Sequence, residues 1–204
     1  MQITLIEPQK KRKDRYNIYI DGEFRFGLDE GVVARFGLYE KKEISEKEIE
    51  QIEKEEVVAK AFNAAANFLR ARERSEKEIR NKLRTKEYSE NIIEKVLEKL
   101  KELNLVDDKR FAEMFVRDRM KLKPKGKKSL EIELKQKGID NKIILEVLDH
   151  LINSESEKEL LERVLEKAKK KYGDLSVLEN KQKIVRYLIS RGFSYDLINS
   201  NLEK

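Results

Sequence analysis

The residues best suited to a binding role in this sequence are clustered basic side chains. Between residues 117 and 128 the chain has one acidic residue, Asp118, and seven basic ones: Arg117, Arg119, Lys121, Lys123, Lys125, Lys127 and Lys128. This basic segment (residues 117–128) carries the whole net charge of +6, and the rest of the chain is neutral. Arg suits bidentate binding of phosphate or carboxylate, and Lys adds positive field at close range. Such a concentrated charge predicts a polyanionic or acidic partner, and Pro124 and Gly126 predict a loop that can adapt to it.

A second group of basic residues precedes this segment. Arg70, Arg72 and Arg74 lie where we expect the first helix of a repeat, in places that correspond to Arg117 and Arg119. The next expected helix carries three more: Lys82, Arg84 and Lys86. In a chain this rich in Lys and Glu, a solvated face of alternating charge explains any single one of these residues equally well.

Residue types that support catalysis are sparse. His150 is the only histidine, which argues against the usual variants of a Ser/His/Asp set. The absence of Cys excludes thiolate nucleophiles and Cys-based metal sites. Asp107 and Asp108 form a carboxylate pair that suits a metal or acid/base chemistry, but they directly precede an apolar helical pattern, where helix capping is the better interpretation. We therefore expect no enzymatic activity, no cofactor and no metal site, and a structural or surface role for His150.

The composition argues against a membrane protein. No apolar run approaches the roughly 20 residues that span a bilayer, mean hydropathy is −0.75, and 42% of residues are charged. The first residues lack the pattern of a secretory signal. We expect a monomer in the cytoplasm.

Apolar residues alternate with polar ones in the first 40 residues, and this period of two predicts strands. The three runs begin at Ile3, at Tyr16 and at Phe24, with a type I′ hairpin turn predicted at Asp21-Gly22 and a basic loop at residues 10–13. A short helix near residues 29–36 should pack Val32, Val33 and Phe36 on this antiparallel sheet.

From Ser45 onward the period becomes 3.6, and a pattern of helix pairs repeats three times. The apolar positions of the first copy begin at Ile79, recur 51 residues later from Leu130, and recur again 54 residues later from Ile184. Each copy joins its two helices through an apolar residue, a capping residue and an Ile four positions further on: Tyr88-Ser89 with Ile93, Ile139-Asp140 with Ile144, and Phe193-Ser194 with Ile198. A further helix precedes each pair, at residues 59–72, 111–121 and 160–172.

These patterns predict a mainly helical protein in which three tandem three-helix repeats form an elongated, curved array behind a small N-terminal antiparallel sheet with a short helix. The expected divisions are residues 1–44 for the sheet, 45–106 for a linker helix and repeat one, 107–153 for repeat two, and 154–204 for repeat three. Gly138 and Gly192 occupy the left-handed position after a helix in repeats two and three, where repeat one has Glu87, so a strained or altered turn is expected at Glu87.

The central motifs resemble those of the RecX regulatory proteins. The resemblance rests on Arg70-x-Arg72-x-Arg74-Ser75-x-x-Glu78-Ile79, Val106-Asp107-Asp108-Lys109-Arg110-Phe111-Ala112, Arg117-x-Arg119, Gly126, and Glu133-Leu134-x-x-Lys137-Gly138-Ile139. It covers residues 59–151 strongly and the third repeat loosely, and the N-terminal sheet is similar to an extension that some members carry. Repeat one departs from the family at Glu87, and repeat three has Lys167, Lys169 and Lys171 in place of an Arg pair.

The resemblance implies a modulator of the RecA recombinase that lies along the groove of the RecA–DNA filament and suppresses recombinase, ATPase and repressor-cleavage activities, with consequences for DNA repair and the SOS response. It also implies weaker direct binding to single- and double-stranded DNA. Whether the protein only restrains RecA or also assists it stays open, as does which basic residues contact RecA and which contact DNA. The alternatives are a stand-alone DNA-binding repeat protein, a scaffold for another complex, and a carboxylate-dependent nuclease using Asp107 or Asp108.

Overall fold

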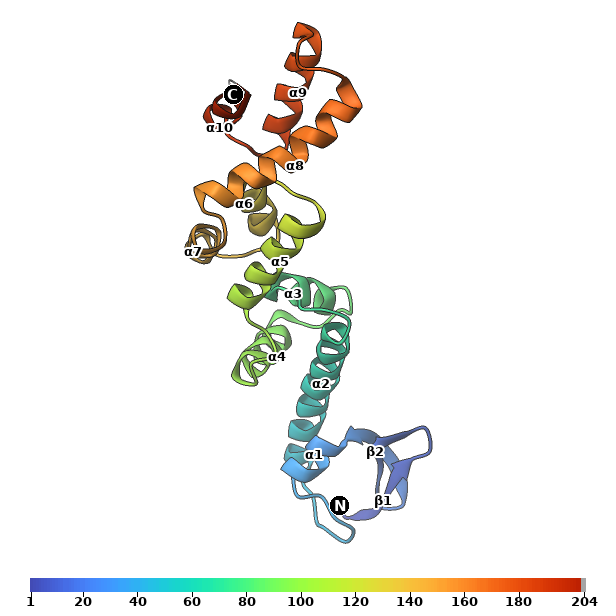
Figure 1. The fold of residues 1–204 in the computed structure, drawn as a ribbon. Coiled ribbons are helices and arrows are strands. Elements are labelled where there is room, and N and C mark those ends of the chain that lie inside the picture. The colour runs from blue at the N-terminus through green and yellow to red at the C-terminus, as the bar shows by residue number, and fades with distance from the viewer. Residues whose placement is uncertain (203–204) are drawn as a thin grey trace. The chain divides into compact units, whose positions relative to one another are not determined.

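The computed structural model describes residues 1–202, which form three strands followed by ten helices (Figure 1). They divide into two compact units. The N-terminal unit comprises Met1–Arg72 and Ile79–Leu105, and the C-terminal unit comprises Glu73–Glu78 and the chain from Val106 onward. The predicted fold class is confirmed: the chain is mainly helical, with a small antiparallel sheet before three three-helix repeats.

The N-terminal sheet has the order β1-β2-β3, with β1 at Ile3–Gln9, β2 at Arg12–Ile20 and β3 at Glu23–Asp29. The hairpin turn forms as predicted, with positive φ at both Asp21 and Gly22. The predicted basic loop at residues 10–13 is shorter than expected, because only residues 10 and 11 form a turn and Arg12 and Lys13 already belong to β2. The pairing of β1 with β2 therefore continues up to Gln9 and Arg12, next to the turn.

Two irregularities in the ladder change which side chains face the core. Register shifts occur between Ile3 and Leu5 and opposite the segment between Phe24 and Phe26. A shift of one residue moves a side chain to the other face of a strand. Leu5 and Phe24 are therefore exposed, although the alternation placed them with buried Ile3 and Leu28, and Phe24 instead packs edge-on against Tyr19.

Two helices complete the N-terminal core. Helix α1 (Glu30–Arg35) places Val32 and Val33 against the sheet, as predicted, and Phe36 packs there just after it. Helix α2 (Glu46–Leu69) begins with the predicted capping box of Ser45 and Glu48. The expected linker helix and the first helix of repeat one form this single continuous helix.

Each repeat adds a helix pair to a preceding helix. Helices α3 (Glu76–Arg84) and α4 (Glu90–Glu102) follow α2 in repeat one; α5 (Asp108–Leu122), α6 (Lys127–Gln136) and α7 (Asn141–Leu151) form repeat two; α8 (Ser154–Tyr172), α9 (Leu178–Ser190) and α10 (Tyr195–Leu202) form repeat three. The three predicted staple residues, Ile93, Ile144 and Ile198, are fully buried. The turns between the paired helices also agree: Gly138 and Gly192 have φ of +83° and +89°, and Glu87 has +64°, which confirms a strained turn in repeat one.

Candidate interaction surface of the helical repeats

The basic segment lies at the joint between repeats two and three. It comprises the last part of α5, a short loop and the first residues of α6. Met120 packs against the cores of both repeats, and Arg163 of α8 donates hydrogen bonds to the carbonyl oxygens of Met120 and Lys121 (2.8 and 2.9 Å). The end of α5 is thus fixed by repeat three as well as by its own repeat.

The predicted loop forms between α5 and α6, and it is anchored to repeat three. Pro124 and Gly126 are buried, and the Gly126 amide donates to the carbonyl oxygen of Arg191 (3.0 Å). A Cβ at Gly126 would lie 2.3 Å from the carbonyl oxygen of Gly192, a distance that no side chain tolerates. The backbone of repeat two therefore approaches repeat three so closely that glycine is required.

Two of the seven predicted cations are bound within the protein. Arg119 Nε donates to Glu133 Oε2 (2.8 Å), and Lys125 pairs with the other oxygen of the same carboxylate. The Arg119 guanidinium also lies over the Phe115 ring, 4.5 Å from its centroid. Partial burial acts to raise the pKa of Glu133, but the hydrogen bonds from Lys125 and Arg119 outweigh it and hold that pKa below its usual range.

A third cation, Lys127, stabilises the start of α6. Its ammonium group is 3.0 Å from Asp149 Oδ1, and its backbone amide donates to Glu157 Oε1 (3.2 Å). Because Gly126 offers no side chain to cap the helix, the Glu157 carboxylate takes that role. Lys127 is thus engaged on both its main chain and its side chain.

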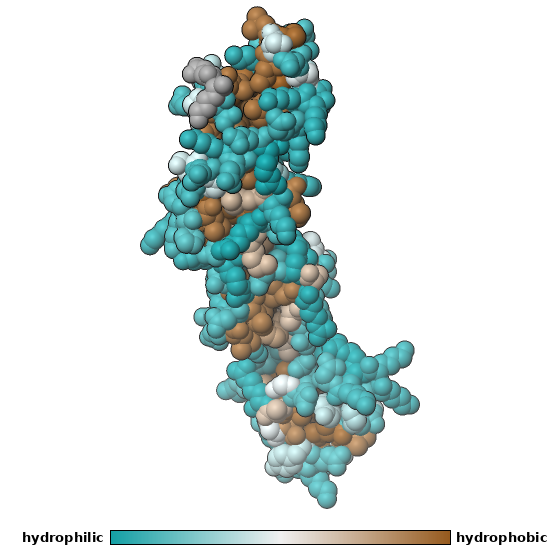
Figure 2. All heavy atoms as spheres, in the orientation of Figure 1, coloured by the Kyte–Doolittle hydropathy of each residue, from teal (hydrophilic) through white to brown (hydrophobic). Residues whose placement is uncertain are grey.

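Four exposed cations remain for a partner: Arg117, Lys121, Lys123 and Lys128. Arg117 lies 3.8 Å from Glu113 in a loose pair at the surface, and Lys121, Lys123 and Lys128 have no hydrogen-bonded acidic neighbour among residues 1–202. Figure 2 shows hydrophilic side chains over most of the visible face, with hydrophobic atoms in separate patches. These four cations lie close in sequence on a backbone fixed by both repeats.

The three predicted arginines of repeat one do not lie on a helix as expected. Helix α2 ends at Leu69 with Arg70 as its C-cap, and Arg72 and Arg74 lie in the connection to α3. Ser75 explains the break, because its hydroxyl accepts the Glu78 amide (3.3 Å) and so starts a new helix. Arg70 and Arg72 are exposed and Arg74 is partly buried, whereas Arg117 and Arg119 belong to α5.

The carboxylate pair acts in capping. Asp107 accepts the amides of Lys109 and Arg110 (2.8 and 3.0 Å) at the start of α5, and Asp108 accepts the Glu76 amide (2.8 Å). Within the part of the chain that the structure describes, no group of three His, Cys, Asp or Glu side chains is placed to hold a metal ion. The lone histidine, His150, is exposed in the last turn of α7.

Sequence reasoning missed a buried ion pair that fastens the sheet to α2. Arg15 Nη2 donates to Glu56 Oε1 (2.6 Å) and to the Gly27 carbonyl oxygen (2.7 Å), while Glu56 Oε2 accepts the Asp29 amide (2.8 Å). The two side chains are 9% and 5% exposed. The only signal was a Glu at a core position of α2, which is ambiguous in a chain so rich in Glu.

Comparison with known proteins decides the family. Four family models match in order along the chain: the RecX N-terminal domain at residues 1–45, and the first, second and third RecX three-helix domains at 61–100, 107–148 and 155–201. This chain belongs to the RecX family of regulatory proteins. Its relatives include proteins named regulatory protein RecX from Bacillus velezensis (40% identical, covering 99% of this chain and 76% of the relative) and Listeria monocytogenes (38%, covering 97% and 73%).

Solved RecX structures agree with this membership. A crystal structure of regulatory protein RecX matches with a TM-score of 0.87 and 32% identity, covering 100% of this chain and 99% of that one. The members of the family that match are regulatory proteins. Among the residues described, no helix combines the length and apolar character needed to cross a membrane.

Proposed function

We propose that this RecX-family protein acts in the cytoplasm as a monomer that binds the RecA–DNA filament groove and inhibits the recombinase, ATPase and repressor-cleavage activities of RecA. The observation that carries the proposal is the set of four exposed cations, held on a fixed backbone where repeats two and three meet. A filament offers DNA phosphates and acidic protein surface along one groove, and both are suitable partners for Arg and Lys. A protein that occupies this groove would block the entry of duplex DNA or of a repressor.

The assignment of roles within the basic segment follows from its contacts. Arg119, Lys125 and Lys127 are engaged with Glu133 and Asp149, so we propose that they shape the segment. The exposed cations Arg117, Lys121, Lys123 and Lys128 are proposed to contact the filament. Arg70 and Arg72 are exposed beyond the end of α2, and they are proposed as separate contacts of the N-terminal unit.

The test compares two variants of equal charge. In the first, the four exposed cations become Gln: Arg117→Gln, Lys121→Gln, Lys123→Gln and Lys128→Gln. The control removes four exposed lysines of the C-terminal unit outside the segment: Lys142→Gln, Lys158→Gln, Lys167→Gln and Lys170→Gln. Binding to RecA filaments on single-stranded DNA, measured against salt by fluorescence anisotropy of the labelled protein, should weaken at least about tenfold in the first variant.

The salt dependence identifies the partner group. If all four cations contact phosphates, the slope of log affinity against log salt should fall by about 2.8 to 3.6. A loss of affinity without loss of slope would assign them to acidic protein surface instead. Equal affinity of the two variants for the filament would contradict the proposed role. Tight binding to bare DNA, with no increase in affinity when RecA coats that DNA, would favour a stand-alone DNA-binding protein.

A further inference from the structure

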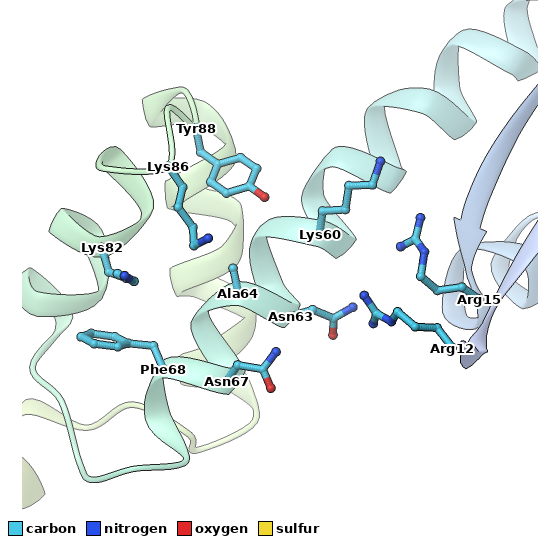
Figure 3. Close-up of a pocket in the computed structure, with 10 residues that line it drawn as sticks. All are labelled: Arg12, Arg15, Lys60, Asn63, Ala64, Asn67, Phe68, Lys82, Lys86 and Tyr88. Atoms are coloured by element: carbon cyan, nitrogen blue, oxygen red, sulfur yellow. The ribbon is translucent and has the colours of Figure 1, made fainter. Parts of the chain in front are cut away.

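A concave basic site lies within the N-terminal unit, outside the basic segment. The cleft has a volume of about 530 Å³ and lies between the start of β2, one face of α2 and the end of α3 (Figure 3). Helix α2 contributes positions three or four residues apart, which place Lys60, Asn63 and Asn67 along one wall. Lys82, Lys86 and Tyr88 face them from the opposite side, and Arg12 closes the end at the sheet.

The lining is rich in cations and contains no carboxylate. Arg15 is committed to Glu56 at the back of the site, and Arg12 pairs at the surface with Asp14 (2.7 Å). Lys60 lies 3.5 Å from Glu56 but keeps half of its side chain exposed, and Lys86 is exposed. Positive side chains on facing walls repel one another until an anion enters, so the cleft favours a phosphate-bearing ligand.

The remaining lining suits a nucleobase. Tyr88 and Phe68 contribute aromatic rings, and Lys82 lies 5.7 Å from the centroid of the Phe68 ring. Amide side chains such as Asn67 can pair with the edge of a base, while aromatic rings stack on its face. The face of a base inside a duplex is already covered by its stacked neighbours, so a nucleotide that stacks on these rings must be unpaired.

We propose that this cleft is a nucleotide-binding site for single-stranded nucleic acid, with phosphates on Arg12, Lys60 and Lys86 and a base between Asn67 and Tyr88. The cleft is open to solvent, so a nucleotide within a longer strand can enter it. The sheet acquires a function here, because the pairing of Arg15 with Glu56 fixes β2 beside α2 and sets the position of Arg12. This inference does not depend on the filament proposal.

The test uses the full chain with the four exposed cations of the basic segment changed to Gln, so that binding at that segment does not hide the cleft. The probe is a fluorescein-labelled oligodeoxythymidylate, and anisotropy is measured against salt. Adding Lys60→Gln and Lys86→Gln, which removes two of the three cations proposed to bind phosphate, should lower affinity about tenfold and reduce the salt slope by about 1.4. The matched control, Lys47→Gln with Lys54→Gln, removes two exposed lysines from α2 outside the cleft and should leave binding unchanged.

A second pair of variants separates stacking from charge. Tyr88→Leu keeps an apolar side chain at the helix junction but removes the ring, and should weaken binding at least about fivefold, whereas Tyr88→Phe should bind as well as the parent. Thermal unfolding of each variant confirms that the fold is retained. Equal binding by Tyr88→Leu and Tyr88→Phe would contradict the proposed stacking of a base on the Tyr88 ring.

Competitors distinguish the source of the nucleotide. Unlabelled single strand should displace the probe, while a duplex of equal length and free ATP should compete poorly. Displacement by ATP at the same nucleotide concentration would overturn a strand site in favour of a free nucleotide. No probe binding in the parent, or equal loss in the cleft variant and its control, would overturn the site altogether.

Discussion

The turn at Glu87 shows how one residue carries a local conformational cost. Its φ of +64° lies in the left-handed region, where repeats two and three have Gly138 and Gly192. A residue with a Cβ loses about 1–2 kcal/mol in that region, while glycine loses somewhat more chain entropy on folding. We predict that Glu87→Gly stabilises the protein by about 0.5–1 kcal/mol in urea unfolding, and that Glu87→Ala, which keeps the Cβ, changes it little. A destabilised glycine variant would contradict a strained turn.

Glu133 is the residue on which the basic segment depends for its shape. Because its pKa is lowered in the folded state, its contribution to stability is present above the ordinary pKa of a Glu, about 4.3, and is lost as pH falls through the folded value. We predict that Glu133→Gln destabilises the protein by about 1–2 kcal/mol at pH 7. The difference between variant and parent should shrink below about pH 4 in urea titrations.

A stability difference between Glu133→Gln and the parent that persisted unchanged at low pH would mean that the charge of the Glu133 carboxylate does not stabilise the fold. A suitable control is Glu179→Gln, whose partner Lys183 lies one turn away on an exposed part of α9. Such a pair contributes little, so the control should unfold like the parent at pH 7.

At the scale of elements, one buried ion pair joins the sheet to α2 beside the apolar core that the two share. Removing Arg15 would leave the Glu56 carboxylate buried without its main cation, although Lys60 lies 3.5 Å away. Breaking such a pair costs about 3–5 kcal/mol. We predict a loss of about 3 kcal/mol for Arg15→Gln in urea unfolding, with faster amide hydrogen exchange in β2 and β3.

The same strand offers the control for this prediction. Arg12 pairs with Asp14 at the surface, where both side chains are about half exposed. Arg12→Gln should therefore unfold at nearly the same urea concentration as the parent. If the two variants were equally stable, the buried pair would not hold the sheet on the helix.

The elements themselves were predictable because their signals are local. The repeated apolar-cap-Ile pattern requires only neighbouring residues, and it correctly placed Ser89, Asp140 and Ser194 before α4, α7 and α10. The bulges that expose Leu5 and Phe24 were not predictable, since they depend on the ladder between strands. The end of α2 at Leu69 could have been predicted from the sequence, because Ser75 and Glu78 have the spacing of a capping box that starts a new helix.

The candidate surface was predictable as a segment but not residue by residue. The charge count singled out residues 117–128, and the structure places this segment where repeats two and three meet. It did not distinguish the exposed Lys121 and Lys123 from Arg119, which is paired with Glu133. Glu133 lies on another helix, and a long side chain can reach in many directions, so the charge count alone does not reveal the pair. The cleft beside Arg12 combines β2, α2 and α3, so no sequence window contains it. The division at residues 44, 106 and 153 stays a prediction.

At the scale of the whole molecule, we propose that the protein is a regulator that works through a partner assembly. Its cations are divided between those that hold repeats in place and those that are exposed, and only the second set should affect regulation. A variant lacking Arg117, Lys121, Lys123 and Lys128 should fold like the parent yet regulate poorly, with circular dichroism melting as the control for folding. A variant that melts at the parent's temperature and regulates fully would contradict this division.

The most direct measurement is ATP hydrolysis by RecA on single-stranded DNA while this protein is titrated well below the RecA concentration. A regulator that binds the filament groove should inhibit hydrolysis at substoichiometric amounts, and the variant without the four exposed cations should require at least about tenfold more protein for the same effect. Unchanged hydrolysis at every ratio, together with tight binding of the protein to bare DNA, would contradict the account.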